Sequence, residues 1–158
     1  MRIIVMSDSH GSAYAVEKII ERNMSADIFV HLGDGEREIG IMQDKYPHLD
    51  IRFVCGNCDY NSMLPPVQII DADGARILCT HGHRYYVKNG TETLRSIARD
   101  NGCNIALFGH THQRYNSYED GIYIMNPGSC SSPRDFSKPS YGFIDITKAG
   151  IVTNIVEI

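Results

Sequence analysis

Five short polar motifs contain the residue types that could bind metal ions. They carry histidine, aspartate and asparagine side chains: Asp8-Ser9-His10, Gly33-Asp34, Gly56-Asn57, His81-Gly82-His83 and Gly109-His110-Thr111-His112. Nitrogen and oxygen donors of this kind suit Mn²⁺, Fe or Zn²⁺. No cysteine is needed to complete the set, which argues against a structural zinc site. The motifs therefore favour a metal centre that acts on a bound substrate.

The position of the motifs explains how residues about a hundred positions apart could meet. Each motif directly follows a short apolar run that is typical of a strand: Ile3 to Met6, Ile28 to Leu32, Ile51 to Cys55, Ile77 to Thr80 and Ile105 to Phe108. In open α/β sheets, ligands bind beyond the carboxyl ends of the strands. Five strand ends that each deliver Asp, His or Asn can converge on one place.

Spacing and neighbouring glycines support the same interpretation. Residues two apart on an extended segment point the same way, so we expect Asp8 with His10, and His110 with His112, to act as pairs. Glycine lets the backbone turn sharply and approach an ion closely. A lone histidine is more often a surface residue or a hydrogen-bonded core residue than a ligand, and we assign His31 and His48 to that class.

The elements around the motifs predict the fold class. Segments 2–7, 27–32 and 51–55 are expected strands, and helices are expected between them, the first with Ser12 as its cap and Met24 on its apolar face, the second over residues 36–46. This β-α-β-α-β order implies a parallel sheet. Three hairpins follow, along with a helix capped by Thr91 and a strand over residues 104–108. We expect an α/β fold in which two mixed β-sheets pack as a sandwich with helices on the outer faces.

Bulk properties limit the remaining choices. A chain of 158 residues suits one compact domain over residues 1–158. The net charge of −4 argues weakly against broad nucleic-acid binding. Five scattered cysteines give poor support for a disulfide framework, and no apolar stretch approaches 18 residues. We expect a soluble, cytoplasmic protein. The segment from Asn126 to Ser140 is a long loop of the kind that is often functional.

The motifs together resemble the calcineurin-like metallophosphoesterase family, which carries Asp-x-His, Gly-Asp, Gly-Asn-His-Asp/Glu, His and Gly-His-x-His in this order. Asn126-Pro127-Gly128-Ser129, followed by Pro133-Arg134, resembles the small YfcE-type phosphodiesterase branch. The resemblance implies the four-layer αββα fold and a dinuclear site at which a metal-bridging hydroxide attacks a phosphodiester. It assigns Asp8, His10 and His112 to one ion, Asn57, His81 and His110 to the other, and Asp34 to both. The implied cofactors are two divalent ions, with Mn²⁺ first and Ni²⁺, Fe or Zn²⁺ as alternatives.

One position departs from the family pattern. The family places a histidine where this chain has Cys58, within Gly56-Asn57-Cys58-Asp59. Cysteine is a poor general acid for an alkoxide, and its thiolate prefers to bind metal. This departure favours diesters or good leaving groups over unactivated monoesters. His83 and Arg134 are candidates to contact the phosphate, with a plain loop role as the alternative for each.

Two other functions remain open at this point. The same fold serves as a scaffold that has lost catalysis, as in the retromer subunit, although all seven expected ligands are present here. Cys55-Gly56-Asn57-Cys58 also spells a Cys-x-x-Cys dithiol, but no helical pattern follows it. We expect a small phosphodiester substrate, with nucleic acid still possible, no membrane partner and a homodimer as a plausible assembly.

Overall fold

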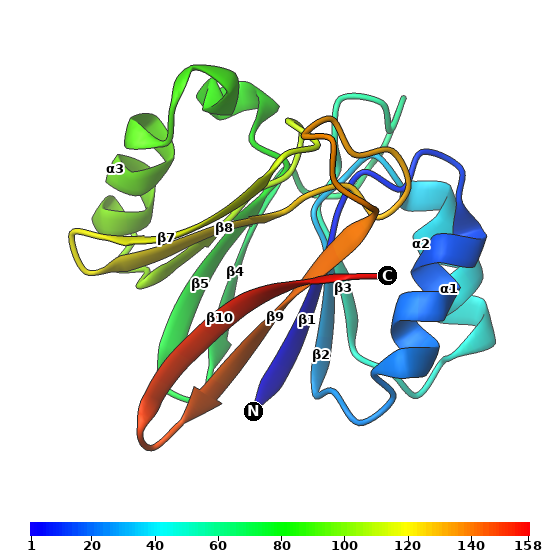
Figure 1. Ribbon diagram of the computed structural model, residues 1–158, viewed down its shortest axis with the longest axis horizontal. Helices are drawn as coiled ribbons and strands as arrows, with labels where there is room; N and C mark the ends of the chain where they lie inside the picture. Colours follow the sequence, from blue (N-terminus) through cyan, green and yellow to red (C-terminus); the bar gives the residue numbers. More distant parts are fainter.

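The computed structural model describes residues 1–158 and has two five-stranded sheets packed face to face (Figure 1). In the first sheet the strand order is β10-β9-β1-β2-β3. Its strands are β1 (Arg2–Met6), β2 (Ile28–His31), β3 (Ile51–Phe53), β9 (Ser140–Thr147) and β10 (Gly150–Glu157). Strands β1, β2 and β3 run parallel, as the β-α-β-α-β order predicts, and β9 joins β1 antiparallel.

The second sheet is also mixed, with the order β4-β5-β6-β8-β7. Its strands are β4 (Val67–Ala72), β5 (Ala75–Thr80), β6 (Ile105–Leu107), β7 (Arg114–Glu119) and β8 (Ile122–Pro127). The hairpin between β4 and β5 turns at Asp73 and Gly74, which both have positive φ, at 48° and 88°. That conformation matches the twist of the flanking strands and explains why an Asp-Gly pair stands there.

Three helices cover the outer faces of the two sheets. Helices α1 (Ala13–Arg22) and α2 (Glu36–Lys45) pack on the first sheet, and α3 (Glu92–Asp100) packs on the second. Two short 3₁₀ turns, η1 (His83–Tyr85) and η2 (Val87–Asn89), precede α3. One apolar cluster fills the space between the sheets, and one lies under each set of helices. The predicted sandwich with helices outside is therefore confirmed.

One detail of the helix predictions was wrong. Helix α1 ends at Arg22, so Met24 lies beyond it and is exposed rather than on the apolar face. Thr91 is the N-cap residue of α3, as predicted, although its side chain makes no capping hydrogen bond. By contrast, Ser12 caps α1, because its hydroxyl oxygen accepts a hydrogen bond from the Ala15 N–H. None of the helices combines the length and the apolar character that crossing a membrane requires.

Candidate metal centre

The loops that leave the carboxyl ends of β1, β2, β3, β5 and β6 gather at one end of the molecule (Figure 1). All seven predicted ligands lie on these loops: Asp8, His10, Asp34, Asn57, His81, His110 and His112. Strand ends from both sheets contribute, so the structure brings together residues that are about a hundred positions apart in the chain. The arrangement is the one expected for parallel strands whose carboxyl ends face a common site.

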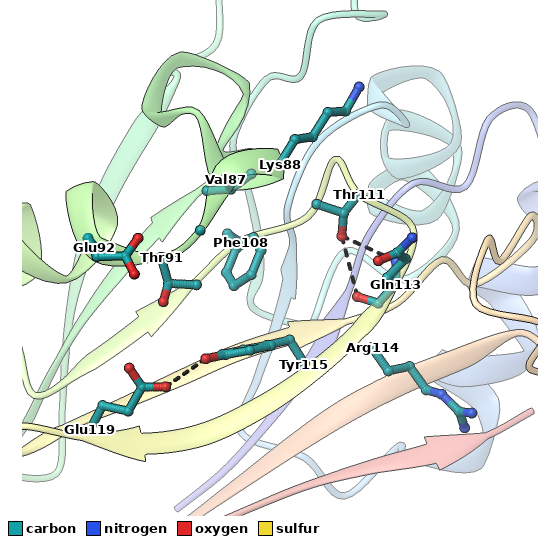
Figure 2. Close-up of a pocket in the computed structure, with 11 residues that line it drawn as sticks. Val87, Lys88, Thr91, Glu92, Phe108, Thr111, Gln113, Arg114, Tyr115 and Glu119 are labelled. Carbon is teal, nitrogen blue, oxygen red and sulfur yellow. Dashed lines mark hydrogen bonds between the residues drawn. The ribbon is translucent and has the colours of Figure 1, made fainter.

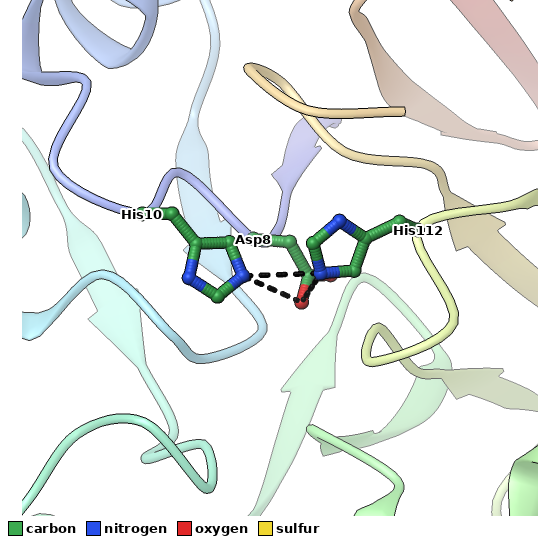
Figure 3. Close-up of side chains that lie close together, drawn as sticks. All are labelled: Asp8, His10 and His112. Carbon is green, nitrogen blue, oxygen red and sulfur yellow. Dashed lines mark hydrogen bonds and ion pairs between the residues drawn. The ribbon is translucent and has the colours of Figure 1, made fainter. Parts of the chain in front are cut away.

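One group of side chains forms around Asp8 (Figure 3). The Nε2 atom of His112 lies 3.3 Å from Asp8 Oδ1 and 3.0 Å from Nε2 of His10. His10 Nε2 is in turn 3.9 Å from Asp8 Oδ1. Three donor atoms therefore face one another at distances that a single cation between them could bridge.

A second group forms around His81. Its Nε2 atom lies 3.4 Å from Asp34 Oδ2 and 3.1 Å from Asn57 Oδ1, and its ring meets that of His110 with 5.1 Å between centroids. Asp34 Oδ2 is also 3.7 Å from His10 Nε2. Asp34 therefore lies between the two groups, in the position that the family resemblance gives to a shared ligand.

The backbone at the site is not extended, which corrects one sequence prediction. Five of the seven residues have positive φ: Asp8 (55°), His10 (42°), Asp34 (57°), His110 (68°) and His112 (57°). Residues other than glycine rarely adopt this left-handed backbone conformation, and each such residue costs on the order of 1–2 kcal/mol of folding free energy. The pairs Asp8 with His10 and His110 with His112 do face one centre, but through tight left-handed turns and not through strand alternation.

The two carboxylates are held for a cation. Asp8 Oδ2 accepts hydrogen bonds from the Ser7 hydroxyl (2.6 Å) and the His110 N–H (3.0 Å). Asp8 Oδ1 is buried and has no hydrogen-bond partner. A buried, unpartnered carboxylate oxygen is costly unless a positive ion compensates it. The donor set thus fits a divalent ion.

Two of the histidines are oriented in the way that metal-binding histidines are. His81 Nδ1 lies 2.6 Å from the Leu32 carbonyl oxygen, and His112 Nδ1 lies 2.7 Å from that of Ser132. A carbonyl can only accept, so each Nδ1 donates, and in the neutral ring each Nε2 offers its lone pair to the centre. Histidines that bind metal ions are commonly fixed by such a bond from the other ring nitrogen.

The protonation states favour the same chemistry. Burial pushes the pKa of Asp34 upward, but hydrogen bonding to His81, the charge of His81 and the Cys58 N–H outweigh it, so the pKa lies below its usual range. The pKa of Asp8 is lowered as well, because its contacts with His112 and His81 outweigh burial. Burial, with the charges of His81 and Lys88, lowers the pKa of His110 to about 4. In the metal-free protein, burial opposes a positive charge on His81 and His112, but their contacts with Asp34 and Asp8 outweigh it and raise both pKa values. A bound divalent ion would take over that positive charge beside the two carboxylates, while His110 is already neutral at neutral pH.

The remaining predicted residues surround this centre. Asn57 is exposed, and its amide nitrogen donates to Cys58 Sγ at 3.3 Å. The His83 ring lies 5.4 Å from that of His81, and its Nδ1 is buried without a partner. Arg134 is exposed, and its backbone N–H donates to the His112 carbonyl. Burial and the charge of Arg134 oppose a rise in the pKa of His112, but hydrogen bonding to Asp8 and Ser132 outweighs them and the pKa is raised. His48 is exposed, as expected for a surface histidine, whereas His31 is buried and hydrogen-bonded.

The thiols do not have the properties of a redox pair. All five cysteines are free, and Cys55 is buried while Cys58 is half-buried. Burial, with the Asp34 carboxylate, raises the pKa of Cys58 to about 11. A reactive dithiol needs a lowered thiol pKa, so the surroundings of Cys58 oppose that function.

Sequence reasoning missed several residues that shape the centre. Asp59 accepts four backbone N–H bonds, from Asp34 (2.7 Å), Gly35 (2.9 Å), Glu36 (2.9 Å) and Gly56 (2.7 Å). The hydroxyls of Ser129 and Ser131 both donate to the Asp8 carbonyl. The signals for the serines were the length of the loop from Asn126 to Ser140 and, for Ser129, its place in the segment that resembles the YfcE-type branch.

Three cavities lie at this end of the molecule. One of about 220 Å³ adjoins the centre and is lined by residues that include His10, Asp34, Cys58 and Asp59. A larger one of about 350 Å³ lies between the start of α3 and β7, with Phe108 and Tyr115 on its walls (Figure 2). Thr111 lines this larger cavity, but none of the predicted ligands does. A third cavity, of about 190 Å³, is lined by residues that include His83 and His110. The cavities beside His10 and beside His110 are therefore the ones through which a substrate could reach the candidate metal centre.

Comparison with known proteins agrees with this geometry. The sequence profile of the calcineurin-like phosphoesterase superfamily domain matches residues 1–149. The chain belongs to the calcineurin-like phosphoesterase superfamily. Members of this superfamily are metal-dependent phosphoesterases, so the chain is a hydrolase of that class and uses divalent metal. The recognition made from the five motifs is confirmed.

Three relatives of this phosphoesterase are informative. Phosphodiesterase YfcE from Escherichia coli K12 is 30% identical over 169 residues, covering 92% of this chain and 88% of YfcE. A predicted phosphoesterase of Streptococcus pneumoniae TIGR4 has a solved structure that superposes with a TM-score of 0.87 at 30% identity, over 99% of this chain and 88% of that one. Vacuolar protein sorting-associated protein 29 of Schizosaccharomyces pombe is 30% identical over 118 residues, covering 69% of this chain and 63% of its own.

Proposed function

We propose that this phosphoesterase hydrolyses phosphodiesters at a dinuclear centre. The observation that carries the proposal is the placement of Asp34 between two groups of donors, one with Asp8, His10 and His112 and one with Asn57, His81 and His110. Two divalent ions bound there would supply a hydroxide nucleophile at neutral pH and neutralise charge on the phosphoryl oxygens. Mn²⁺ is our first choice of ion, with Ni²⁺, Fe and Zn²⁺ as alternatives that suit the same donors.

The protein's own residues would divide the remaining work. His81 and His112 keep their Nε2 atoms aimed at the centre through their Nδ1 bonds to carbonyls. Arg134 is an exposed cation beside His112 and makes no ion pair, so its guanidinium is available to a phosphate oxygen. His83 borders the group around His81 from the other side and can contact the same phosphate.

Cys58 sets the expected preference among substrates. It stands where the family has a histidine that can protonate a leaving group, and a thiol whose pKa is about 11 is a poor acid for this step. Diesters with good leaving groups should therefore react better than alkyl monoesters. The name of the YfcE relative supports a diester substrate.

The decisive experiment compares metals and substrates. The protein is stripped with chelator, reloaded with Mn²⁺, Ni²⁺ or Zn²⁺, and assayed on bis-p-nitrophenyl phosphate and p-nitrophenyl phosphate. We expect turnover that depends on metal and is faster on the diester. Turnover that requires no metal, or no turnover of either substrate with any of the three ions, would contradict the proposal.

A second candidate function is a metal-binding scaffold of the same fold. It is favoured by the 30% identity to vacuolar protein sorting-associated protein 29. The two functions differ in one measurement, because a scaffold would bind two equivalents of metal without hydrolysing any phosphoester. The complete set of seven predicted ligands favours the enzyme.

A further inference from the structure

A chain of buried polar side chains lies beneath the metal centre and contains none of its predicted ligands. Ser9, His31 and Glu38 come from the first ligand loop, the end of β2 and helix α2, and they are 0%, 0% and 4% exposed. The Ser9 hydroxyl lies 2.7 Å from Glu38 Oε1, and His31 Nε2 lies 3.1 Å from Ser9 Oγ. Buried polar groups of this kind hold a unique arrangement only if each has a partner, and these do.

The direction of each hydrogen bond in the chain is determined. The Gly33 N–H donates to His31 Nδ1 at 3.3 Å, so the proton of the neutral His31 ring is on Nε2 and is donated to Ser9 Oγ. The Ser9 hydroxyl can then donate only onward, to Glu38. The same Glu38 oxygen also accepts the Gly11 N–H at 2.6 Å. This series of hydrogen bonds thus runs from Gly33 on the second ligand loop to Gly11 on the first.

Its two ends lie next to strained ligands. Ser9 and Gly11 are the immediate neighbours of His10, whose φ is 42°, and Gly33 precedes Asp34, whose φ is 57°. A non-glycine residue stays in the left-handed region only when its surroundings hold it there. Gly35 also packs closely against these side chains, because a Cβ at that position would overlap the Ser9 hydroxyl and the His31 ring.

We propose that Ser9, His31 and Glu38 form a positioning network that fixes His10 relative to Asp34 and thereby sets the affinity of the ion that these two residues share. The inference rests on the proposed metal centre but assigns roles to residues outside its ligand set. Hydrogen-bonding partners behind metal ligands typically change metal affinity 10–100-fold when they are removed. Ser9, His31 and Glu38 are positioning residues here and do not touch the substrate.

Four variants test the network. Ser9→Ala breaks its centre, Glu38→Ala removes the acceptor of both Ser9 and Gly11, and Glu38→Gln keeps an acceptor but removes the charge. Asp44→Asn is the matched control, because Asp44 is an exposed carboxylate in the same helix that lies outside the cavity beside the centre and whose side chain makes no hydrogen bond or ion pair. Each variant is titrated with Mn²⁺ by calorimetry, and electron paramagnetic resonance distinguishes one bound ion from a coupled pair.

We expect Ser9→Ala and Glu38→Ala to weaken one of two ions by about tenfold or more. Glu38→Gln should lose less metal affinity than Glu38→Ala, and Asp44→Asn should bind both ions as the parent does. Because both substitutions break the same hydrogen-bonded network, the Ser9→Ala/Glu38→Ala double variant should bind no more weakly than the weaker single variant. Unchanged affinities in folded Ser9→Ala and Glu38→Ala proteins, or equal weakening in Asp44→Asn, would overturn the proposal.

A measurement on the metal-free protein gives an independent answer. Nitrogen-15 spectra of the parent should show His31 with its proton on Nε2, and Glu38→Gln should shift the amide resonances of both Gly11 and Gly33. A shift confined to Gly11 would mean that the chain does not link the two loops. If the parent protein binds no metal at all, the proposed function fails; if it binds two ions and the variants do so equally well, only the network fails.

Discussion

Asp34 and His112 occupy different places in the centre, so single substitutions at the two positions should have different consequences. Asp34 Oδ2 lies within 3.7 Å of His10 and 3.4 Å of His81, which belong to different groups of donors. His112 contacts only Asp8 and His10 within the centre. We predict that Asp34→Asn reduces the bound metal to well below one equivalent, whereas His112→Ala retains about one equivalent of two.

Elemental analysis of the purified, reloaded variants measures both contents. The parent protein and His48→Ala should both retain full metal, because His48 is an exposed histidine that precedes β3, whereas the ligand loops follow the carboxyl ends of the strands. Equal metal loss in Asp34→Asn and His112→Ala would mean that Asp34 is not shared between two ions.

His31 gives a prediction about pH that does not involve a ligand. Burial lowers its pKa from 6.5 to about 4, although carboxylates on neighbouring elements, those of Asp8, Asp59 and Glu38, pull it upward. At a pH between about 4 and 6.5, His31 therefore binds a proton in the unfolded chain but not in the folded chain. The free energy of unfolding therefore falls as the pH drops from about 6.5 toward 4, by about 3 kcal/mol over the whole window for this one group.

Urea unfolding of metal-free protein at several pH values tests this prediction. Comparison with His31→Gln isolates the contribution of His31, because other titrating groups are shared by both proteins. The slope of unfolding free energy against pH should be smaller in the variant by up to about 1.4 kcal/mol per pH unit. Parallel slopes would show that His31 is protonated at its usual pH in the folded protein.

At the scale of elements, Asp59 joins the start of α2 to the loop after β3. Its two carboxylate oxygens accept N–H groups from Asp34, Gly35 and Glu36 on one side and from Gly56 on the other. A negative charge also interacts favourably with the N-terminus of a helix. Asp59→Asn keeps the shape but replaces one acceptor oxygen by a donor, so two of these N–H groups lose their partner. We predict a loss of about 1–3 kcal/mol in unfolding free energy.

Denaturant unfolding of the metal-free proteins measures the loss. Asp50→Asn is the control, since Asp50 pairs only with the exposed Arg52 and should change stability by less than about 0.5 kcal/mol. If Asp59→Asn also changed the free energy of unfolding by less than about 0.5 kcal/mol, the four N–H groups would have to find other hydrogen-bond partners.

The elements also show why the sequence could place the candidate ligands at strand ends but not predict the conformation of their backbone. Strands β1, β2 and β6 are buried throughout or nearly so, and such strands read as continuous apolar runs whose ends can be found. Gly11, which follows the left-handed His10, donates its N–H to Glu38, and Glu38 lies 27 positions away. Asp59, Glu38 and Ser129 act on backbone groups of distant segments, and residue types do not encode such partners.

At the scale of the whole molecule, the metal centre connects the two sheets. Asp8 and Asp34 follow β1 and β2 of the first sheet, whereas His81 and His112 follow the ends of β5 and β6 in the second. The apolar cluster between the sheets holds them together along their length, and most of its strands are found in the sequence as short apolar runs. Polar contacts join the ligand-bearing ends of the two sheets. One of them is the hydrogen bond from His81 Nδ1 to the carbonyl oxygen of Leu32, a residue 49 positions earlier in the sequence.

Because ions bound there would contact both sheets in the folded state only, they should stabilise the whole protein. A free ion concentration about 100 times the dissociation constant adds about 2.7 kcal/mol. For a chain of this length, that corresponds to a rise in Tm of roughly 5–10 °C over the chelated protein. Hydrogen exchange should slow in the ligand loops of both sheets, while the turn between β7 and β8 at Asp120 and Gly121 should exchange at the same rate with and without metal. Slower exchange in the loops of one sheet alone would show that the ions do not link the two sheets.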